Sequence, residues 1–263
     1  MGIDTTPPPL KLSFRQRLTW GAHLFKAVAY QYHRPLLPHL KRLVPRNGVV
    51  VDVGAHAGQF AKLFSQLVPK GYVYAFEPGL YALSILKLVV KWRGLRNVRI
   101  LRLGLSDASG SETLHVPLKR HGTMGFGLAH LGGPLGDRQT HAQTIRLTTL
   151  DLFVSEHMLH RLDFIKADIE GWEVNMLKGG MESIREFRPV IMIEINEAAL
   201  ARANARPQEI FDLLLPLDYR VFRTDENLDY QIWAAQGFAG TADYLFVPQE
   251  KTERVKLAAS ALP

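Results

Sequence analysis

Cysteine is absent from all 263 residues of the sequence. This absence excludes a disulfide framework, a thiolate zinc site and a cysteine nucleophile. Long apolar runs are also missing, because no stretch approaches the roughly 18 uncharged residues that a membrane-spanning helix requires. The first residues are followed by prolines and lack the basic and apolar regions of a signal peptide. We therefore expect neither export nor membrane insertion, and a cytoplasmic location.

Acidic residues are missing from one segment. Residues 10–46 contain eight Lys and Arg residues and no Asp or Glu, in a chain of formal net charge +7. Phe14, Leu18, Phe25 and Val28 recur here at helical spacing, with basic residues between them. We expect a basic amphipathic helix that packs on the main domain or makes a peripheral contact with an anionic surface, such as a membrane or glycolipid. Nucleic acid is a less favoured partner, because no recognisable binding module joins these residues.

The patterns divide the chain into four parts. Residues 1–9 include three consecutive prolines and are expected to be disordered. Residues 10–46 form the basic helical extension, residues 47–248 the main domain, and residues 249–263 a C-terminal tail. Within the main domain, six glycines in residues 121–137 predict a mobile loop.

The main domain alternates short β-branched runs with helical periodicity, which is typical of a parallel sheet with crossover helices. We expect an α/β fold with a mostly parallel sheet of about seven strands, flanked by helices. The strands are expected over residues 49–53, 72–76, 98–103, 144–147, 164–167, 190–195, 219–222 and 244–247, with an extra strand at 112–116.

A glycine turn follows the first strand, in the segment VVVDVGAHAG at residues 49–58. Gly54 and Gly58 stand between a strand and a helix, at the edge of an open α/β sheet where the backbone can approach a ligand closely. Their Gly-x-x-x-Gly spacing differs from the Gly-x-Gly-x-x-Gly of dinucleotide folds, and no Gly-Lys-Ser/Thr is present. The segment therefore disfavours NAD and ATP, and fits either another ligand or an ordinary tight turn.

Polar side chains follow the next strands. Glu77 ends the second strand, 25 positions after Asp52. A carboxylate there can accept both hydroxyls of a ribose, although a charge at a helix terminus is an alternative. Ser106 and Asp107 follow the third strand and either reach an adenine amino group or shape a turn. Asp168 ends a later strand and should lie at the same crevice.

These segments, in this order, resemble the FkbM family of methyltransferases. The matching stretches are DVGAxxG at residues 52–58, FEP at 76–78, LSD at 105–107, TLD at 149–151, DFIKxDIEGxE at 163–173 and LKG at 177–179. The resemblance covers residues 48–247. It implies a Rossmann-like class I methyltransferase fold with a seven-stranded sheet, S-adenosylmethionine as methyl donor, and transfer to a hydroxyl oxygen.

The resemblance also implies roles for individual residues. Gly54 and Gly58 line the cofactor, Glu77 binds its ribose, and Asp168 lies beside its methionine part. His56 stands where the family commonly has Asn. The complete set of expected cofactor-binding residues is Asp52, Gly54, Ala55, His56, Gly58, Glu77, Ser106, Asp107 and Asp168.

A sulfonium donor is already activated, so methyl transfer chiefly requires an aligned acceptor oxygen and a base that takes its proton. The candidates for this base are His121, Asp168, Glu170 and Glu194, of which we predict Asp168, Glu194 and His121 as catalytic. Glu170 and Glu173 also fit charges in the first turn of a helix. Asp168 and Glu194, with Asn196, could hold one divalent ion that assists the reaction, but we do not predict a metal site.

The expected function is O-methylation of a hydroxyl on a small molecule or a glycan, with S-adenosylmethionine as cofactor. Two alternatives stay open at this point. One is methylation of RNA or of a nitrogen atom, and the other is a non-catalytic module that binds S-adenosylmethionine.

Overall fold

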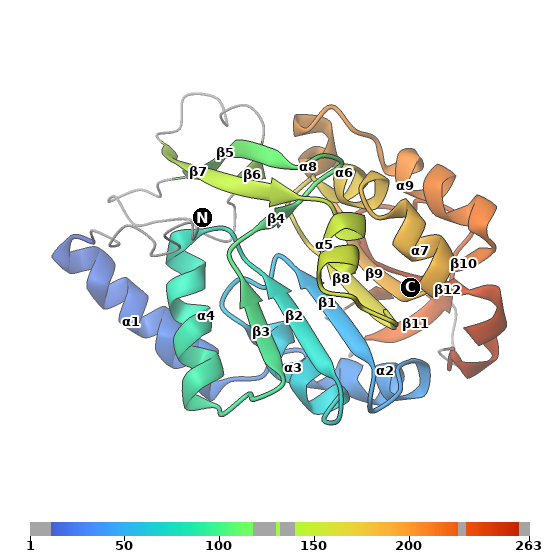
Figure 1. The fold of residues 1–263 in the computed structure, drawn as a ribbon, viewed down its shortest axis with the longest axis horizontal. Coiled ribbons are helices and arrows are strands. Elements are labelled where there is room, and N and C mark those ends of the chain that lie inside the picture. The colour runs from blue at the N-terminus through green and yellow to red at the C-terminus, as the bar shows by residue number, and fades with distance from the viewer. Residues whose placement is uncertain (1–11, 118–129, 132–139, 226–229, 258–263) are drawn as a thin grey trace.

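The computed structural model describes residues 12–117, 130–131, 140–225 and 230–257. Within these residues the chain forms one large and one small β-sheet with helices packed around them (Figure 1). The predicted disorder of residues 1–9, most of the glycine-rich segment and the end of the predicted tail lie outside the described residues. No helix in the described ranges is both long and apolar enough to cross a membrane.

The large sheet has eight strands among the described residues, and not the expected seven. Five neighbouring strands run parallel, and three more continue the sheet antiparallel beyond β9. In spatial order the strands are β11 (Gln231–Ala234), β10 (Tyr219–Asp225), β12 (Ala242–Pro248), β9 (Val190–Ile195), β8 (Phe164–Ala167), β1 (Val49–Val53), β2 (Tyr72–Phe76) and β3 (Val98–Leu101). The sequence pattern does not predict β11. It also does not predict that β10 and β12 pair antiparallel, because a run of apolar residues carries no information on strand direction.

A second sheet holds two strands that we expected in the first. It consists of β4 (Gly104–Leu105), β7 (Thr140–Thr148), β5 (Gly110–Pro117) and β6 (His130–Leu131). The predicted strands at 112–116 and 144–147 therefore exist, but they pair with each other as an antiparallel ribbon. This ribbon lies above the carboxyl ends of β1 to β3 in Figure 1.

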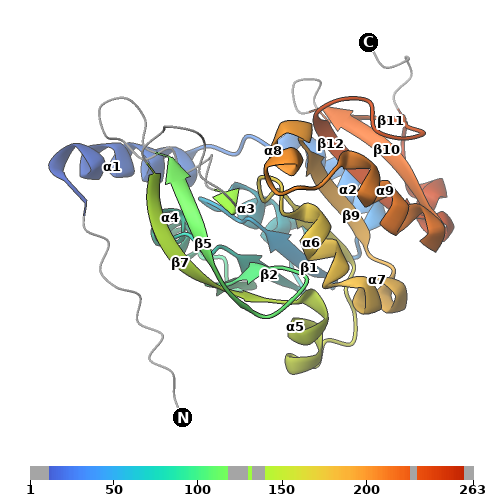
Figure 2. The same cartoon turned by 90° about the horizontal axis from the view of Figure 1, so that it is seen from above.

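Strand residues alternate between two apolar layers, one on each face of the large sheet. Val49, Val51 and Val53 belong to one buried cluster and Val50 to the other, as the two-residue period of a strand requires. The first face is covered by α5 (Leu150–Glu156), α6 (Glu173–Lys178), α7 (Met181–Phe187) and α9 (Pro207–Leu214). The second face is covered by α2 (Leu37–Leu43), α3 (Gln59–Leu67) and α4 (Leu80–Trp92). Figure 2 shows the sheet between these helices.

The basic extension contains the predicted helix, α1 (Phe14–Ala29), which packs on α4. The face that packs differs from the apolar stripe seen in the sequence. Leu24 and Ala27 are buried and Val28 of the stripe is half-buried beside them, whereas Phe14, Leu18 and Phe25 are exposed. The helix therefore packs on the main domain, as expected, but mainly through residues outside the predicted apolar stripe.

Phe211 of α9 packs against two aromatic side chains of β12, and we expect this cluster to contribute strongly to the free energy of unfolding. Phe211 is fully buried, and its ring centroid lies 5.8 Å from that of Tyr244 and 5.4 Å from that of Phe246. We predict that Phe211→Ala lowers the free energy of unfolding in urea by about 3–5 kcal/mol, because it leaves a cavity in a close-packed layer. The control Leu152→Ala, at a side chain that is 41% exposed, should change it by less than about 0.5 kcal/mol. Similar losses in both variants would contradict this assignment.

Candidate active site

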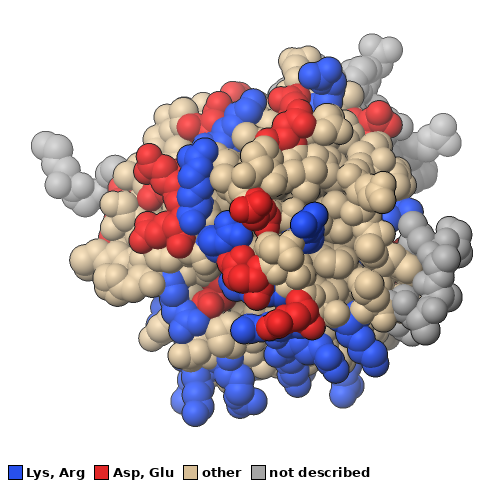
Figure 3. All heavy atoms as spheres, turned by 90° about the vertical axis from the view of Figure 1, so that its right-hand side faces the viewer, with Lys and Arg blue, Asp and Glu red and all other residues tan. Residues whose placement is uncertain are grey.

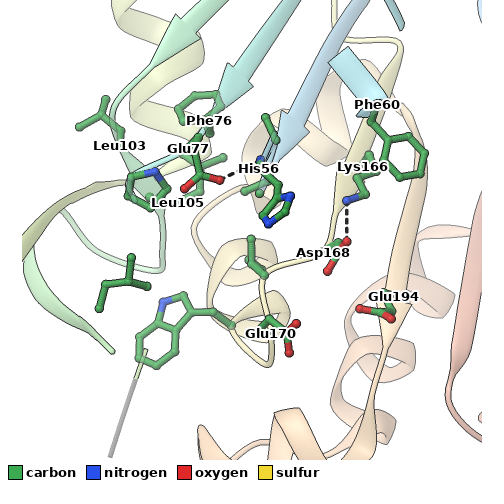
Figure 4. A pocket seen from close by; sticks show the side chains of 18 of the residues that line it. His56, Phe60, Phe76, Glu77, Leu103, Leu105, Lys166, Asp168, Glu170 and Glu194 are labelled. Carbon is green, nitrogen blue, oxygen red and sulfur yellow. Dashed lines mark hydrogen bonds and ion pairs between the residues drawn. The ribbon is translucent and has the colours of Figure 1, made fainter. Parts of the chain in front are cut away.

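A cavity of about 380 Å³ opens at the carboxyl edge of the parallel strands. Its walls come from the turn after β1, the ends of β2, β8 and β9, and the small sheet above them (Figure 4). Ligands of α/β sheets bind at this edge, and the volume is typical of a small-molecule site. The cavity brings together most of the residues predicted for cofactor binding and catalysis.

The glycine turn forms the floor of the cavity. Gly54 and Gly58 both have positive φ angles, of 78° and 84°. A Cβ atom on Gly54 would lie 2.0 Å from the backbone oxygen of Asp168, so only glycine lets the two loops approach. Gly58 directly precedes α3 in the left-handed conformation but does not line the cavity, and a Cβ atom there would meet Leu86 and Val89 of α4 instead. The turn therefore lets the loops after β1 and β8 approach each other, and Ala55 lines the cavity beside it, whereas the close approach of this backbone to a ligand stays a prediction.

His56 also has a positive φ, of 50°. Asn and His both tolerate this left-handed conformation better than most residues, which explains why His can stand where the family commonly has Asn. Its backbone N–H donates to Oε2 of Glu77 over 2.8 Å. Burial lowers the pKa of His56 to about 4, so the ring is neutral at pH 7.

Glu77 lies at the end of β2 with its carboxylate buried in the cavity wall. Its two oxygens accept backbone hydrogen bonds from His56 and Gly79, each over 2.8 Å. Burial raises the pKa of Glu77 to about 7, against the opposing effect of these two bonds. A carboxylate has about four acceptor positions, so two remain for hydroxyl groups of a ligand.

Asp52 lies behind the cavity and not among the residues that line it. Its side chain is fully buried, and neither carboxylate oxygen has a hydrogen-bond partner in the described structure. Burial raises the pKa of Asp52 to about 7, and the neighbouring Lys166 counteracts this rise. Asp52 and Lys166 are paired in register on adjacent strands, which brings a negative group beneath the ammonium.

Ser106 and Asp107 do not line the cavity, although we predicted contacts with adenine. The Ser106 hydroxyl donates to Oδ1 of Asp107 over 2.9 Å and accepts from the indole N–H of Trp172 over 3.0 Å. Trp172 does line the cavity. In this arrangement the two polar residues position an aromatic wall, and a direct contact with a ligand stays a prediction.

Lys166, Asp168 and Glu194 form the opposite end of the cavity (Figure 4). Lys166 Nζ lies 2.9 Å from Oδ2 of Asp168 and 4.6 Å from the centre of the Phe60 ring. Only 3% of its side chain is exposed. Burial alone would lower the pKa of Lys166, but the charges of Asp168 and Asp52 outweigh it and hold the pKa above its usual value.

The side chains of Asp168 and Glu194 are hydrogen-bonded to each other, and their pKa values are shifted in opposite directions. Burial would raise the pKa of Asp168, but Lys166 holds it below its usual value, so Asp168 is ionised. Burial and the Asp168 charge both raise the pKa of Glu194, and Asp243 and Glu170 add to this effect. Glu194 therefore carries the proton of the pair and donates it to Asp168. Both predicted catalytic carboxyls thus lie in the cavity, whereas His121 is outside the described residues.

Glu170, a candidate base, and Glu173, expected in the first turn of a helix, differ in their surroundings. Glu170 lies in the loop before α6 with a φ of 56°, so it is not in a helical turn. Burial, followed by the Asp168 charge, raises its pKa to about 7. Glu173 does begin α6, but it is buried, and its Oε1 accepts from the N–H groups of Ile169 and Gly171 over 3.0 and 3.3 Å. It holds the loop that carries Asp168.

Sequence reasoning missed His33, which the extension contributes to the cavity. Its ring stacks on Phe60 with centroids 4.1 Å apart and is hydrogen-bonded to the Tyr230 hydroxyl. Burial, followed by the charge of Lys166, lowers the pKa of His33 to about 4. Lys166 was missed as well. A lysine at an inward position of an apolar strand was the signal that could have revealed it.

The suggested oxygen ligands for a divalent ion are only partly available. Asn196 caps α8 (Glu197–Arg202), where its side-chain oxygen accepts from the N–H of Ala199 over 3.1 Å. Across the described part of the chain, no group of three or more His, Asp or Glu side chains is arranged to hold a metal ion.

The sequence is similar to several methyltransferases. The 2-O-methyltransferase NoeI of Sinorhizobium fredii is 26% identical over 221 residues, which cover 78% of this chain and 86% of NoeI. The methyltransferase sdnD of Sordaria araneosa is 25% identical over 188 residues, covering 63% of this chain and 71% of sdnD.

Two solved structures match this chain at low similarity. The methyltransferase FkbM from Methylobacillus flagellatus matches with a TM-score of 0.48 and 16% identity, over 88% of this chain and 59% of that one. Cofactor-bound Rv0187 from MTB matches with a TM-score of 0.49 and 10% identity, over 90% and 91%.

The sequence profile of the Methyltransferase FkbM domain matches residues 52–221. This range begins at the aspartate before the glycine turn and includes both ends of the cavity. The large sheet, with its parallel strands around β1, is the core of the Rossmann-like class I methyltransferase fold. The chain belongs to the FkbM family of methyltransferases.

Proposed function

We propose that the protein is an S-adenosylmethionine-dependent O-methyltransferase that acts on a hydroxyl of a small metabolite or a glycan. The observation that carries this proposal is the cavity itself. It is built on a glycine turn, with a buried carboxyl group at one end, Glu77, and a half-buried carboxyl pair at the other, Asp168 and Glu194.

The charge of the cavity fits a cationic donor. Four carboxyl groups line it, and the ammonium of Lys166, already paired with Asp168, is the single Lys or Arg charge among the lining residues of the described chain. The carboxyl groups are those of Glu77, Asp168, Glu170 and Glu194. A ligand that brings a sulfonium and an ammonium relieves this excess of acidic groups.

The lining of the cavity is apolar around Glu77 and polar around Asp168. Around Glu77 the walls are apolar, and Leu103, Leu105, Leu114, Ile145 and Trp172 supply them. Such a slot suits a flat adenine ring, with the ribose hydroxyls at Glu77. The amino-acid part then faces the glycine turn and Asp168.

Bound S-adenosylmethionine supplies a methyl group on a positively charged sulfur. The protein has to align the acceptor hydroxyl and take its proton. Asp168 is held ionised by Lys166 and stabilises positive charge. Glu194 holds a proton because burial and the neighbouring Asp168 charge raise its pKa. A cation beside the pair would lower the pKa of Glu194, so that Glu194 first releases its proton to solvent and the resulting carboxylate can then accept the proton of the acceptor hydroxyl.

The choice of an oxygen acceptor is supported by the relative NoeI, whose name describes a 2-O-methyltransferase. The cavity adds a second argument. His33 and Phe60 present stacked rings beside Lys166, and such rings offer an apolar surface next to hydrogen-bonding groups. A sugar ring or a hydroxylated metabolite presents the matching combination of apolar and hydroxyl faces.

The pKa of Glu77 predicts how donor binding depends on pH. The ionised carboxylate accepts both ribose hydroxyls, so the affinity for S-adenosylmethionine should rise as the pH increases through about 7 and level off above it. Asp52 and Lys166, whose charges act on Glu77 in opposite directions, should modify this curve only in part. Calorimetric titration of the wild type and Glu77→Gln at about pH 6 and pH 8 measures it.

We expect Glu77→Gln to weaken binding about tenfold or more at the higher pH and to flatten the dependence. Glu156→Gln, at an exposed position of α5, is the matched control and should behave as the wild type. Absence of binding by the folded wild type would refute the donor assignment.

Because Glu194 is the proposed base and Asp168 the proposed partner of the donor, we predict that substitutions at the two residues affect kcat and donor affinity differently. Glu194→Gln should lower kcat about 10²- to 10⁴-fold, because the base is lost, with little change in donor affinity. Asp168→Asn should weaken donor binding. It should also move the pH profile of kcat to lower pH, since the charge that raises the pKa of Glu194 is removed. Transfer of labelled methyl groups to hydroxylated metabolites and oligosaccharides measures both effects.

Full turnover in both variants would overturn the catalytic assignment. Labelling of RNA, without labelling of any hydroxylated metabolite or oligosaccharide, would favour an RNA methyltransferase instead.

A further inference from the structure

Helix α1 exposes the apolar residues that an amphipathic helix normally buries. The exposed fractions are 76% for Phe14, 61% for Leu18 and 66% for Phe25. Spacings of four and seven residues bring these three side chains onto one side of the helix. Leu24 and Ala27 bury the opposite side against α4. The apolar stripe therefore points outward.

Three contacts fix this orientation. The indole N–H of Trp20 donates to the Ser84 hydroxyl on α4 over 2.8 Å, and the His23 ring is hydrogen-bonded to the Tyr81 hydroxyl. The buried ammonium of Lys62 donates to the backbone oxygen of Ala27 over 2.6 Å, at the carboxyl end of α1. The helix cannot rotate its stripe inward without breaking these bonds.

Two aromatic side chains continue the stripe beyond the helix. Tyr30 is 51% exposed and Tyr32 is 56% exposed. The ring of Phe25 meets that of Tyr30 edge-on with centroids 6.4 Å apart, and the Tyr30 and Tyr32 rings stack at 5.9 Å. We call Phe14, Leu18, Phe25, Tyr30 and Tyr32 together the α1 face.

Basic side chains border this face. Helical geometry sets Arg15 and Lys26 on one flank of the stripe and Arg17 on the other, and all three are exposed. No acidic residue occurs between positions 10 and 46. Further along the extension, Lys41 and Arg42 in α2 are exposed as well. On the side of the molecule away from α1, Figure 3 shows Lys and Arg gathered along the lower edge, the edge at which Figure 1 draws α2.

We propose that the α1 face docks on the surface of an anionic lipid bilayer. An apolar stripe between two basic flanks matches a surface whose acyl boundary lies just beneath negative headgroups, and tyrosines are stable at that boundary. A second copy of the chain fits less well, because pairing two such faces would oppose like charges. Nucleic acid would match the basic flanks but leave the Phe and Leu side chains without an apolar partner.

Sedimentation of the full chain with lipid vesicles tests the proposal. We expect binding to phosphatidylcholine vesicles that contain phosphatidylglycerol, little binding to phosphatidylcholine alone, and weaker binding at high salt. The triple variant Phe14→Ser, Leu18→Ser, Phe25→Ser should reduce the bound fraction about tenfold or more. Its matched control is Trp92→Ser with Met158→Ser, because these side chains are 60% and 75% exposed elsewhere.

A pair of charge reversals tests the flanks. Arg15→Glu with Lys26→Glu should reduce binding to the anionic vesicles, whereas Arg185→Glu with Arg254→Glu, at exposed positions outside the extension, should not. Circular dichroism and the thermal midpoint verify that each variant is folded.

Three results would overturn the proposal. One is no binding of the wild type to anionic vesicles at low salt, and another is equal loss in the triple variant and its control. The third is a dimeric wild type that the triple variant converts to a monomer without any change in vesicle binding, which would assign the face to a second copy.

Discussion

The arrangement of the cavity depends on the buried ammonium of Lys166. Having lost its water, this charge is stable only while carboxylates beside it stay ionised. Asp168 just beyond β8 meets that requirement, while Asp52 on the adjacent strand, whose pKa burial raises to about 7, meets it only in part. The resulting charge on Asp168 then adds to the effect of burial on Glu170, Glu173 and Glu194, and raises the pKa of each. One lysine in a central strand thereby keeps Asp168 ionised, and burial together with the Asp168 charge raises the pKa of the acids around it.

Much of the central fold was predictable because buried parallel strands leave a strong pattern. Strands β1, β2, β8 and β9 have the bounds that the apolar runs indicated. The runs of β1, β2 and β8 are directly followed by Gly54, Glu77 and Asp168. The same logic located Gly54, Glu77 and Asp168, since the carboxyl ends of neighbouring parallel strands lie close together whatever the intervening helices contain.

The remaining features depend on contacts between distant segments, which a local pattern does not encode. His33 is hydrogen-bonded to Tyr230 across 197 positions of sequence, and no periodicity links the two. The pairing of β5 with β7 in a separate sheet depends on the turn of the chain after β3. Ser106 was located correctly at a strand end, but its hydroxyl is used by Trp172, a partner 66 residues away. Position along a strand was predictable, and the partner of each side chain was not.

The left-handed backbone at His56 has a consequence for how this position can vary. The conformation is fixed by neighbours, because the backbone N–H must point at Glu77 while the flanking glycines turn the chain. Residues with a branched Cβ are excluded by strain, whereas Asn, Asp, Gly and His are accepted whatever their side chains do. The residue types that relatives can have at this site are thus limited first by the backbone conformation, and only then by side-chain contacts with a ligand. A change of residue type here is weak evidence for a change of ligand.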